Sequence, residues 1–175
     1  MPDAPAPALT HVTTADGWQI ALHRLDPPPG VAPKPTPVIV CHGVASNRFN
    51  FEATGPASLP RHLARQGWPV YLLELRGGGA SEQPGWFSDH AWTYTFDDYV
   101  LRDLPAAIEH VAAQGQTGQV HWVGHSMGGM VLYGYLARVG NRRVRSATAL
   151  GSPPYGPSHL RTLNGLTALW PLVEA

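Results

Sequence analysis

Short apolar runs alternate with helical patterns along most of this chain, and this alternation constrains the fold more than any other feature of the sequence. The runs at 37–41 and 70–75 are rich in valine, isoleucine and leucine, as expected of strands that are covered on both faces. Two further short strands are predicted at 120–123 and 144–150. The helical patterns lie at 59–66, 96–114 and 127–139. Elements in this order predict an α/β fold, with a mostly parallel sheet and helices on both faces.

A β-hairpin is predicted ahead of the alternating elements. The residues Ala15-Asp16-Gly17 separate two short runs at 9–14 and 18–25, and Asp-Gly between two such runs is a strong hairpin signal. The hairpin brings the expected number of strands to six, in a chain whose 175 residues suffice for one core. Pro105 lies inside the predicted helix 96–114, where its missing N–H predicts a kink or a split.

Composition excludes several classes of function. Acidic and basic residues number 12 each, so the chain lacks the positive charge that binds nucleic acid. No apolar run is long enough to span a bilayer, and residues 1–10 lack the features of a secretory signal. The single cysteine, Cys41, cannot form an internal disulfide, and the nine histidines show no metal-ligand spacing. We therefore expect a cytoplasmic protein with no metal site, no cofactor, no membrane span and no nucleic-acid partner.

The pentapeptide Gly124-His125-Ser126-Met127-Gly128 is the motif that carries chemistry. It follows the predicted strand at 120–123 and opens the predicted helix at 127–139, which is the context of a nucleophile elbow. In such a turn the serine holds a strained backbone conformation, so that its hydroxyl projects above the sheet. We therefore predict Ser126 as a nucleophile. Nearby glycines would avoid collisions with the adjacent strand and helix: Gly124, Gly128 and Gly129.

Two backbone N–H groups are predicted to form an oxyanion hole beside this serine. The N–H of Met127 is free because it lies at a helix N-terminus, where the helix dipole also favours negative charge. The His42-Gly43 turn directly follows a predicted strand and would bring the N–H of Val44 to the site. An ordinary strand-end turn is the alternative, but acyl transfer needs two convergent donors, which favours the oxyanion interpretation. His42 itself is predicted to pack beneath the turn.

Three motifs in this order resemble the α/β-hydrolase superfamily, most of all its lipases and esterases and the related acyltransferases that make polyesters. They are Val-Ile-Val-Cys-His-Gly at 38–43, Tyr-Leu-Leu-Glu-Leu-Arg-Gly-Gly-Gly-Ala-Ser at 71–81 and Val-Gly-His-Ser-Met-Gly-Gly at 123–129. The resemblance covers about residues 9–150 and implies the α/β-hydrolase fold. The family usually carries aspartate before Arg-Gly in the second motif, whereas here Glu74 stands two residues before Arg76. We interpret Glu74 and Arg76 as parts of the turn and not as catalytic residues.

The resemblance also implies a catalytic triad in the order serine, acid, histidine. The histidine takes the serine proton, and the carboxylate fixes the histidine tautomer. After Ser126 the only acidic residue is Glu174 and the only histidine is His159, and His125 is expected to point away from the serine. We therefore expect the acid and the histidine beyond Ala175, in a chain truncated after its sixth strand at the start of a cap.

The predicted organisation is a disordered tail at 1–8, the N-terminal part of the hydrolase core at 9–150 and the start of a cap or lid at 151–175. The predicted function is a serine carboxylic ester hydrolase of lipase or esterase type, which acts on a small-molecule acyl ester through an acyl-serine intermediate. An acyltransferase on the same fold and an inactive binding module are the alternatives. Dehalogenases and epoxide hydrolases are disfavoured because they carry aspartate where Ser126 stands.

Overall fold

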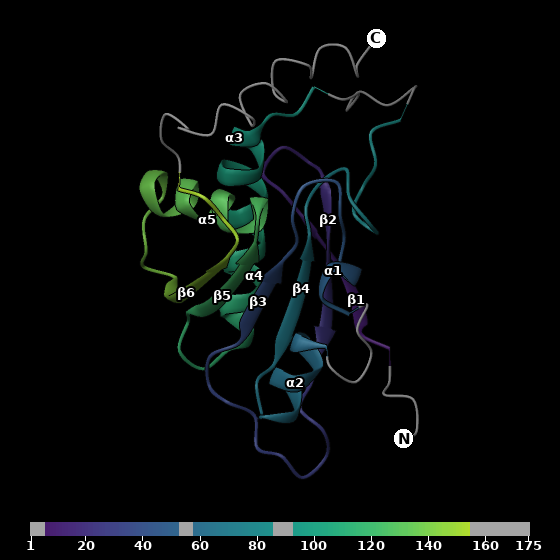
Figure 1. Cartoon of the computed structure of the whole chain (residues 1–175), viewed down its shortest axis with the longest axis vertical. Coiled ribbons are helices and arrows are strands. Elements are labelled where there is room, and N and C mark those ends of the chain that lie inside the picture. Colours follow the sequence, from purple (N-terminus) through teal and green to yellow (C-terminus); the bar gives the residue numbers. More distant parts are fainter. Residues whose placement is uncertain (1–5, 53–57, 86–92, 155–175) are drawn as a thin grey trace.

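The computed structural model describes residues 6–52, 58–85 and 93–154, and in these residues the chain forms one six-stranded sheet (Figure 1). The strands are β1 (Ala8–Thr13), β2 (Gln19–Leu25), β3 (Val38–Cys41), β4 (Val70–Glu74), β5 (Val120–His125) and β6 (Val144–Leu150). Their order across the sheet is β1-β2-β4-β3-β5-β6. Strand β2 is antiparallel to both of its neighbours, and the other three pairings are parallel. The predicted mostly parallel sheet is confirmed.

The hairpin predicted at the start of the chain is also present. Strands β1 and β2 pair in antiparallel register, from Ala8 opposite Arg24 to Thr13 opposite Gln19. The turn between them contains Gly17 with a φ of 91°, a left-handed conformation that glycine adopts without strain. The N–H of Gly17 donates to the carbonyl oxygen of Thr14 over 3.0 Å and closes the turn.

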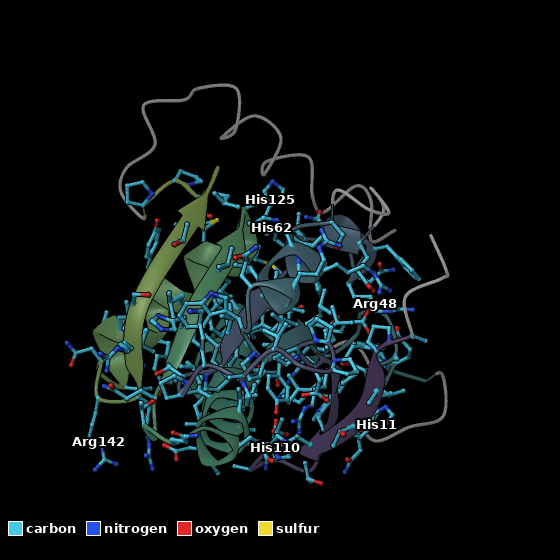
Figure 2. The ribbon with its side chains drawn as sticks, turned by 90° about the horizontal axis from the view of Figure 1, so that it is seen from below. His11, Arg48, His62, His110, His125 and Arg142 are labelled. Atoms are coloured by element: carbon cyan, nitrogen blue, oxygen red, sulfur yellow. The ribbon has the colours of Figure 1, made fainter. Side chains whose placement is uncertain are left out.

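Helices cover both faces of the sheet. They are α1 (Phe49–Glu52), α2 (Leu59–Arg65), α3 (Phe96–Asp98), the π-helical turn η2 (Tyr99–Asp103), α4 (Leu104–Gln114) and α5 (Met127–Arg138). Figure 2 shows His62 of α2 and His110 of α4 on opposite sides of the sheet. Alternate residues of β3 serve the two faces: Ile39 packs with the α4 and α5 cluster, and Val40 packs with the α2 cluster. Strand β3 is therefore buried on both sides, as its apolar sequence predicts.

The predicted split of the helix at 96–114 takes the form of a π-helical turn. The N–H of Leu104 donates to the carbonyl oxygen of Tyr99, five residues earlier, where an α-helix would use the residue four earlier. Pro105 follows at once, has no N–H to give and would crowd the carbonyl group of Leu101 in a regular helix. The wider turn accommodates the proline and lets the helix continue as α4.

Strand β6 lies at the edge of the sheet opposite β1 (Figure 1), and most of its residues are exposed, as expected of an edge strand. At the other end of the chain, residues 1–5 of the predicted tail lie outside the described residues, and β1 begins at Ala8. Most of the predicted cap, residues 155–175, also lies outside them. Of the helices described, none has the length and the apolar character that crossing a membrane requires.

Candidate active site

Ser126 lies at the sharp turn between β5 and α5. Its backbone has φ 50° and ψ −118°, a conformation that residues other than glycine rarely adopt. Strand β5 ends at His125 and α5 begins at Met127, so Ser126 is the single residue between them. The N–H of Ser126 donates to the carbonyl oxygen of Leu150 at the end of β6 over 2.9 Å. The residue predicted as nucleophile therefore occupies a strained turn of the elbow type.

Glycine is required around this turn because backbones approach closely there. A Cβ at Gly124 would lie 2.5 Å from the backbone nitrogen of Gly129. A Cβ at Gly128 would overlap the carbonyl oxygens of Cys41 and His42 at the end of β3. The carbonyl groups on the neighbouring strand cannot move aside as a flexible side chain could. The glycines of the motif thus let α5 begin directly against the sheet.

The residues that carry the two predicted oxyanion donors, Val44 and Met127, line the same cavity. Met127 is the first residue of α5, so its N–H has no acceptor within the helix, and Val44 lies in the loop after β3. Among the turn and loop hydrogen bonds of the described residues, none uses the N–H of Val44. Gly43, the residue before Val44, packs against the serine, and a Cβ added to Gly43 would lie 3.2 Å from the Cβ of Ser126.

Backbone strain marks the Val44 loop as well as the serine. Among the described residues, Ala45 and Ser126 are the non-glycine residues with positive φ, and each has a φ of 50°. Ala45 directly follows Val44. Conformations of this kind cost about 1–3 kcal/mol each and cluster at functional sites. Nothing in the sequence distinguishes Ala45 from an ordinary loop alanine, so the sequence analysis could not identify it.

His42 is buried beneath the turn, 3% exposed, and its hydrogen bonds define its protonation state. Its Nδ1 lies 2.7 Å from the carbonyl oxygen of Gly43 and must donate to it. Its Nε2 accepts from the N–H of Leu75 over 3.4 Å. Burial lowers the pKa of His42, so the neutral Nδ1–H tautomer is favoured. Both ring nitrogens are engaged by backbone groups, which leaves neither free as a base.

His125, the residue before the serine, contacts α1. Its Nδ1 lies 3.4 Å from the Nδ2 of Asn50, and its ring packs edge-on against Phe51 at 6.4 Å between centroids. Both partners belong to α1. Figure 2 places His125 toward the side of His62, away from His110. Among the described residues, no side chain forms a hydrogen bond with the Ser126 hydroxyl, and His159 and Glu174 lie outside them.

Glu74 holds together two of the loops that surround the site. Its carboxylate accepts from the backbone N–H groups of Arg48 and Ala80 over 2.9 and 2.8 Å, and it lies 2.8 Å from Nε2 of His23. Burial alone would raise the pKa of Glu74, but these hydrogen bonds lower it below its usual range. The loop after β4 wraps around this carboxylate so closely that a Cβ at Gly79 would overlap it. The structure supports the interpretation of Glu74 as part of the turn.

A cavity of about 990 Å³ opens beside Val44 and Met127. The glycine-rich loop at 77–79 forms part of its lining, and an aromatic wall forms another part. We define the aromatic wall as Tyr94, Phe96 and Tyr99. No motif marks these residues, and their clustering just before and within the predicted helix 96–114 is the signal that the sequence offers for them. Val44 and Met127, which carry the two predicted oxyanion donors, both line this cavity, and Met127 directly follows Ser126.

Comparison with known proteins places this arrangement in a family. A family model described as the alpha/beta hydrolase fold matches residues 36–172. The chain is 33% identical over 168 residues, 88% of its length, to triacylglycerol lipase 2 of Arabidopsis thaliana. It is 29% identical over 153 residues, 80% of its length, to human lysosomal acid lipase/cholesteryl ester hydrolase. The chain spans 39% and 37% of the lengths of these two relatives.

Solved structures show the same architecture. An alpha/beta hydrolase from Novosphingobium aromaticivorans superposes with a TM-score of 0.65 at 25% identity, over 91% of this chain and 49% of that one. An esterase from Exiguobacterium antarcticum superposes with a TM-score of 0.64 at 22% identity, over 91% of this chain and 53% of that one. These likenesses confirm the predicted fold.

Proposed function

The chain belongs to the alpha/beta hydrolase fold family, and from that premise we propose that the protein containing it is a carboxylic ester hydrolase with Ser126 as its nucleophile. The observation that carries the proposal is the turn itself. Ser126 has φ 50° at the start of α5, beside a cavity that Met127 and Val44 line. The relatives named as lipases and esterases support an ester as the substrate.

In the proposed reaction the Oγ of Ser126 attacks the ester carbonyl carbon, and the serine proton passes to a histidine. The N–H groups of Met127 and Val44 stabilise the negative charge on the carbonyl oxygen, and one such donor is typically worth about 3 kcal/mol in the transition state. The intermediate then expels the alcohol, which takes the proton from the histidine and leaves an acyl-serine. Water repeats the sequence, releasing the carboxylic acid and restoring the serine.

The base and its carboxylate partner are proposed to lie outside the described residues. His42 has both ring nitrogens engaged by backbone groups, and His125 contacts α1. A serine hydroxyl without a base is a weak nucleophile, so the described residues hold a prepared but incomplete site. We expect a histidine and an acidic residue, following Ser126 in the chain, to complete it.

The test uses the full-length protein that contains this chain. It should release p-nitrophenol from short acyl esters, and a fluorophosphonate probe should label Ser126. Ser126→Ala should abolish both signals. Ser146→Ala is the matched control, because this serine pairs with His121 near the start of β5, at the other end of the strand from the Ser126 turn.

Each outcome bears on a separate part of the proposal. Turnover that persists in Ser126→Ala would eliminate this serine as the nucleophile. A wild-type protein that neither turns over esters nor reacts with the probe would favour the inactive binding module. If Ser126→Ala loses both ester turnover and probe labelling while Ser146→Ala keeps both, the result supports the acyl-serine mechanism.

A further inference from the structure

A buried ion-pair network lies behind the glycine-rich loop, and the proposed chemistry does not use it. We define it as Asp16, Arg76 and Asp103. The guanidinium of Arg76 donates from Nε to Asp103 over 2.8 Å and from Nη1 to Asp16 over 2.7 Å. The backbone N–H of Arg76 also donates to Asp103 over 3.0 Å. The side chains of Arg76 and Asp103 are 1% and 0% exposed, and that of Asp16 is 24% exposed.

The network joins three segments that are far apart in the sequence. Asp16 lies in the turn between β1 and β2, Arg76 lies in the loop after β4, and Asp103 ends the π-helical turn η2. Burial raises the pKa of Asp103 to about 6, although Arg76 opposes the shift. Burying charges is costly, and apolar residues of similar size often stabilise a core as well or better. The burial of these charges is therefore weak evidence that the network serves stability alone.

The aromatic wall of the cavity is attached to this network through Trp18. The guanidinium carbon of Arg76 lies over the Trp18 ring, 5.0 Å from its centroid. Trp18 packs edge-on against Tyr94 at 5.4 Å, and Tyr94 packs against Tyr99 at 5.6 Å. The hydroxyl of Tyr94 in turn fills the space beside Gly77, where a Cβ would overlap it. The position of Tyr94 is thus set from both sides by groups next to Arg76.

The nucleophile has separate supports. Ser126 is held by β5, by the first turn of α5 and by its hydrogen bond to Leu150. Within the described residues, no hydrogen bond or ion pair links the network to Ser126 or to Met127. A substitution in the network would therefore alter the position of the aromatic wall more than the position of the Ser126 hydroxyl.

We propose that the Asp16–Arg76–Asp103 network is a positioning device for the aromatic wall, so that it determines how the acyl ester binds and not how Ser126 reacts. Tyr94 is the specificity-determining residue through which it acts. This inference rests on the proposed ester hydrolase function. A lost wall contact weakens substrate and transition state alike, so it raises KM and leaves kcat unchanged.

The test is a double-mutant cycle in the full-length protein. Asp16→Ala removes the most accessible acceptor of Arg76 and keeps the buried Asp103 pair. Asp26→Ala is the matched control, since it breaks an exposed ion pair with Arg24 at the other end of β2. Tyr94→Ala removes the wall residue, and the double variant Asp16→Ala/Tyr94→Ala closes the cycle. KM and kcat for p-nitrophenyl butyrate, the rate of labelling by a small fluorophosphonate and the melting temperature are measured for each.

Asp16→Ala is expected to raise KM about tenfold, with kcat and the labelling rate within about twofold of the wild type. In the Tyr94→Ala background, Asp16→Ala should raise KM no further. An additive rise, or a loss confined to kcat and labelling, would overturn the positioning role. So would an equal rise in KM for Asp26→Ala. A wild type without turnover would overturn the proposed function and this inference with it, whereas a wild type with turnover and an unchanged KM in Asp16→Ala overturns this inference alone.

Discussion

The indole N–H of Trp122 donates a hydrogen bond to the carbonyl oxygen of Gly128 over 3.0 Å, joining strand β5 to the first turn of α5. The bond spans the turn that carries Ser126. Trp122 is 1% exposed, so the bond is shielded from water. A strained turn persists only where its surroundings hold it, and this bond holds both of its ends.

Replacing Trp122 by phenylalanine should loosen that turn. Trp122→Phe removes the indole donor and part of the buried ring, and losing a buried hydrogen bond of this kind costs about 1–3 kcal/mol. Urea unfolding should show the loss, and fluorophosphonate labelling of Ser126 should slow. Trp68→Phe is the control, because Trp68 is only partly buried against the other cluster and packs on His121. An equal effect of both substitutions would show that ring size alone matters.

The backbone of Ser126 should make glycine a more stable replacement than alanine. With φ at 50° and ψ at −118°, a Cβ is strained at this position, whereas glycine is not. Glycine relieves the backbone strain, but its unfolded chain has more conformational entropy, which offsets part of the gain. The free energy of unfolding of Ser126→Gly should therefore be about 1 kcal/mol higher than that of Ser126→Ala. Neither variant should hydrolyse esters. Denaturant midpoints of equal value for the two variants would contradict strain at this turn.

The close approach of α5 to β3 predicts a different penalty at two glycines of the same helix. In Gly128→Ala the new methyl group meets the Cys41 and His42 carbonyl oxygens, which cannot move without disturbing the sheet. We expect a loss of about 3 kcal/mol, as for severe overpacking. In Gly134→Ala the nearest atom is a side-chain methyl of Val100 at 2.8 Å, and alanine favours the helix by about 1 kcal/mol. Melting temperatures should therefore fall clearly for Gly128→Ala and much less for Gly134→Ala.

Stability should depend on pH through His42. Burial lowers the pKa of His42 in the folded state, while the unfolded chain keeps a value of about 6.5. The folded state therefore resists protonation, so the contribution of His42 is fully present above that pH. It is lost as pH falls below about 6.5, by up to about 1.4 kcal/mol per unit. His42→Asn should lose less stability than the wild type between pH 7 and pH 5, and parallel pH profiles of the two proteins would contradict this.

Apart from the four-residue helix α1, which was not predicted, the elements of this chain were predictable because each is encoded within a short window. Mostly apolar runs mark β3 and β4, and Gly17, Gly67 and Gly140 stand where turns need a positive φ. The Ser126 turn follows the same rule, since strand, motif and helix are adjacent in sequence. Even the split at 96–114 follows from one residue, Pro105, although its π-helical form does not.

The contacts that shape the cavity were not predictable in this way. Arg76 meets Asp103 across 27 residues and Asp16 across 60, and nothing in a short window marks these three as partners. They meet because β2 is inserted beside β4 and because η2 packs behind the loop after β4. The second hydrogen bond of the His42 ring is likewise long-range, since its Nε2 accepts from the N–H of Leu75, just after β4.

The sequence by itself determined the order of strands and helices and the place of the candidate nucleophile, because local periodicity and turn chemistry depend on neighbours along the chain. Tertiary structure alone decided which aromatic residues line the cavity and which buried charges stand behind them. These contacts depend on the order of the strands across the sheet and on close packing, which bring together residues that no local pattern connects.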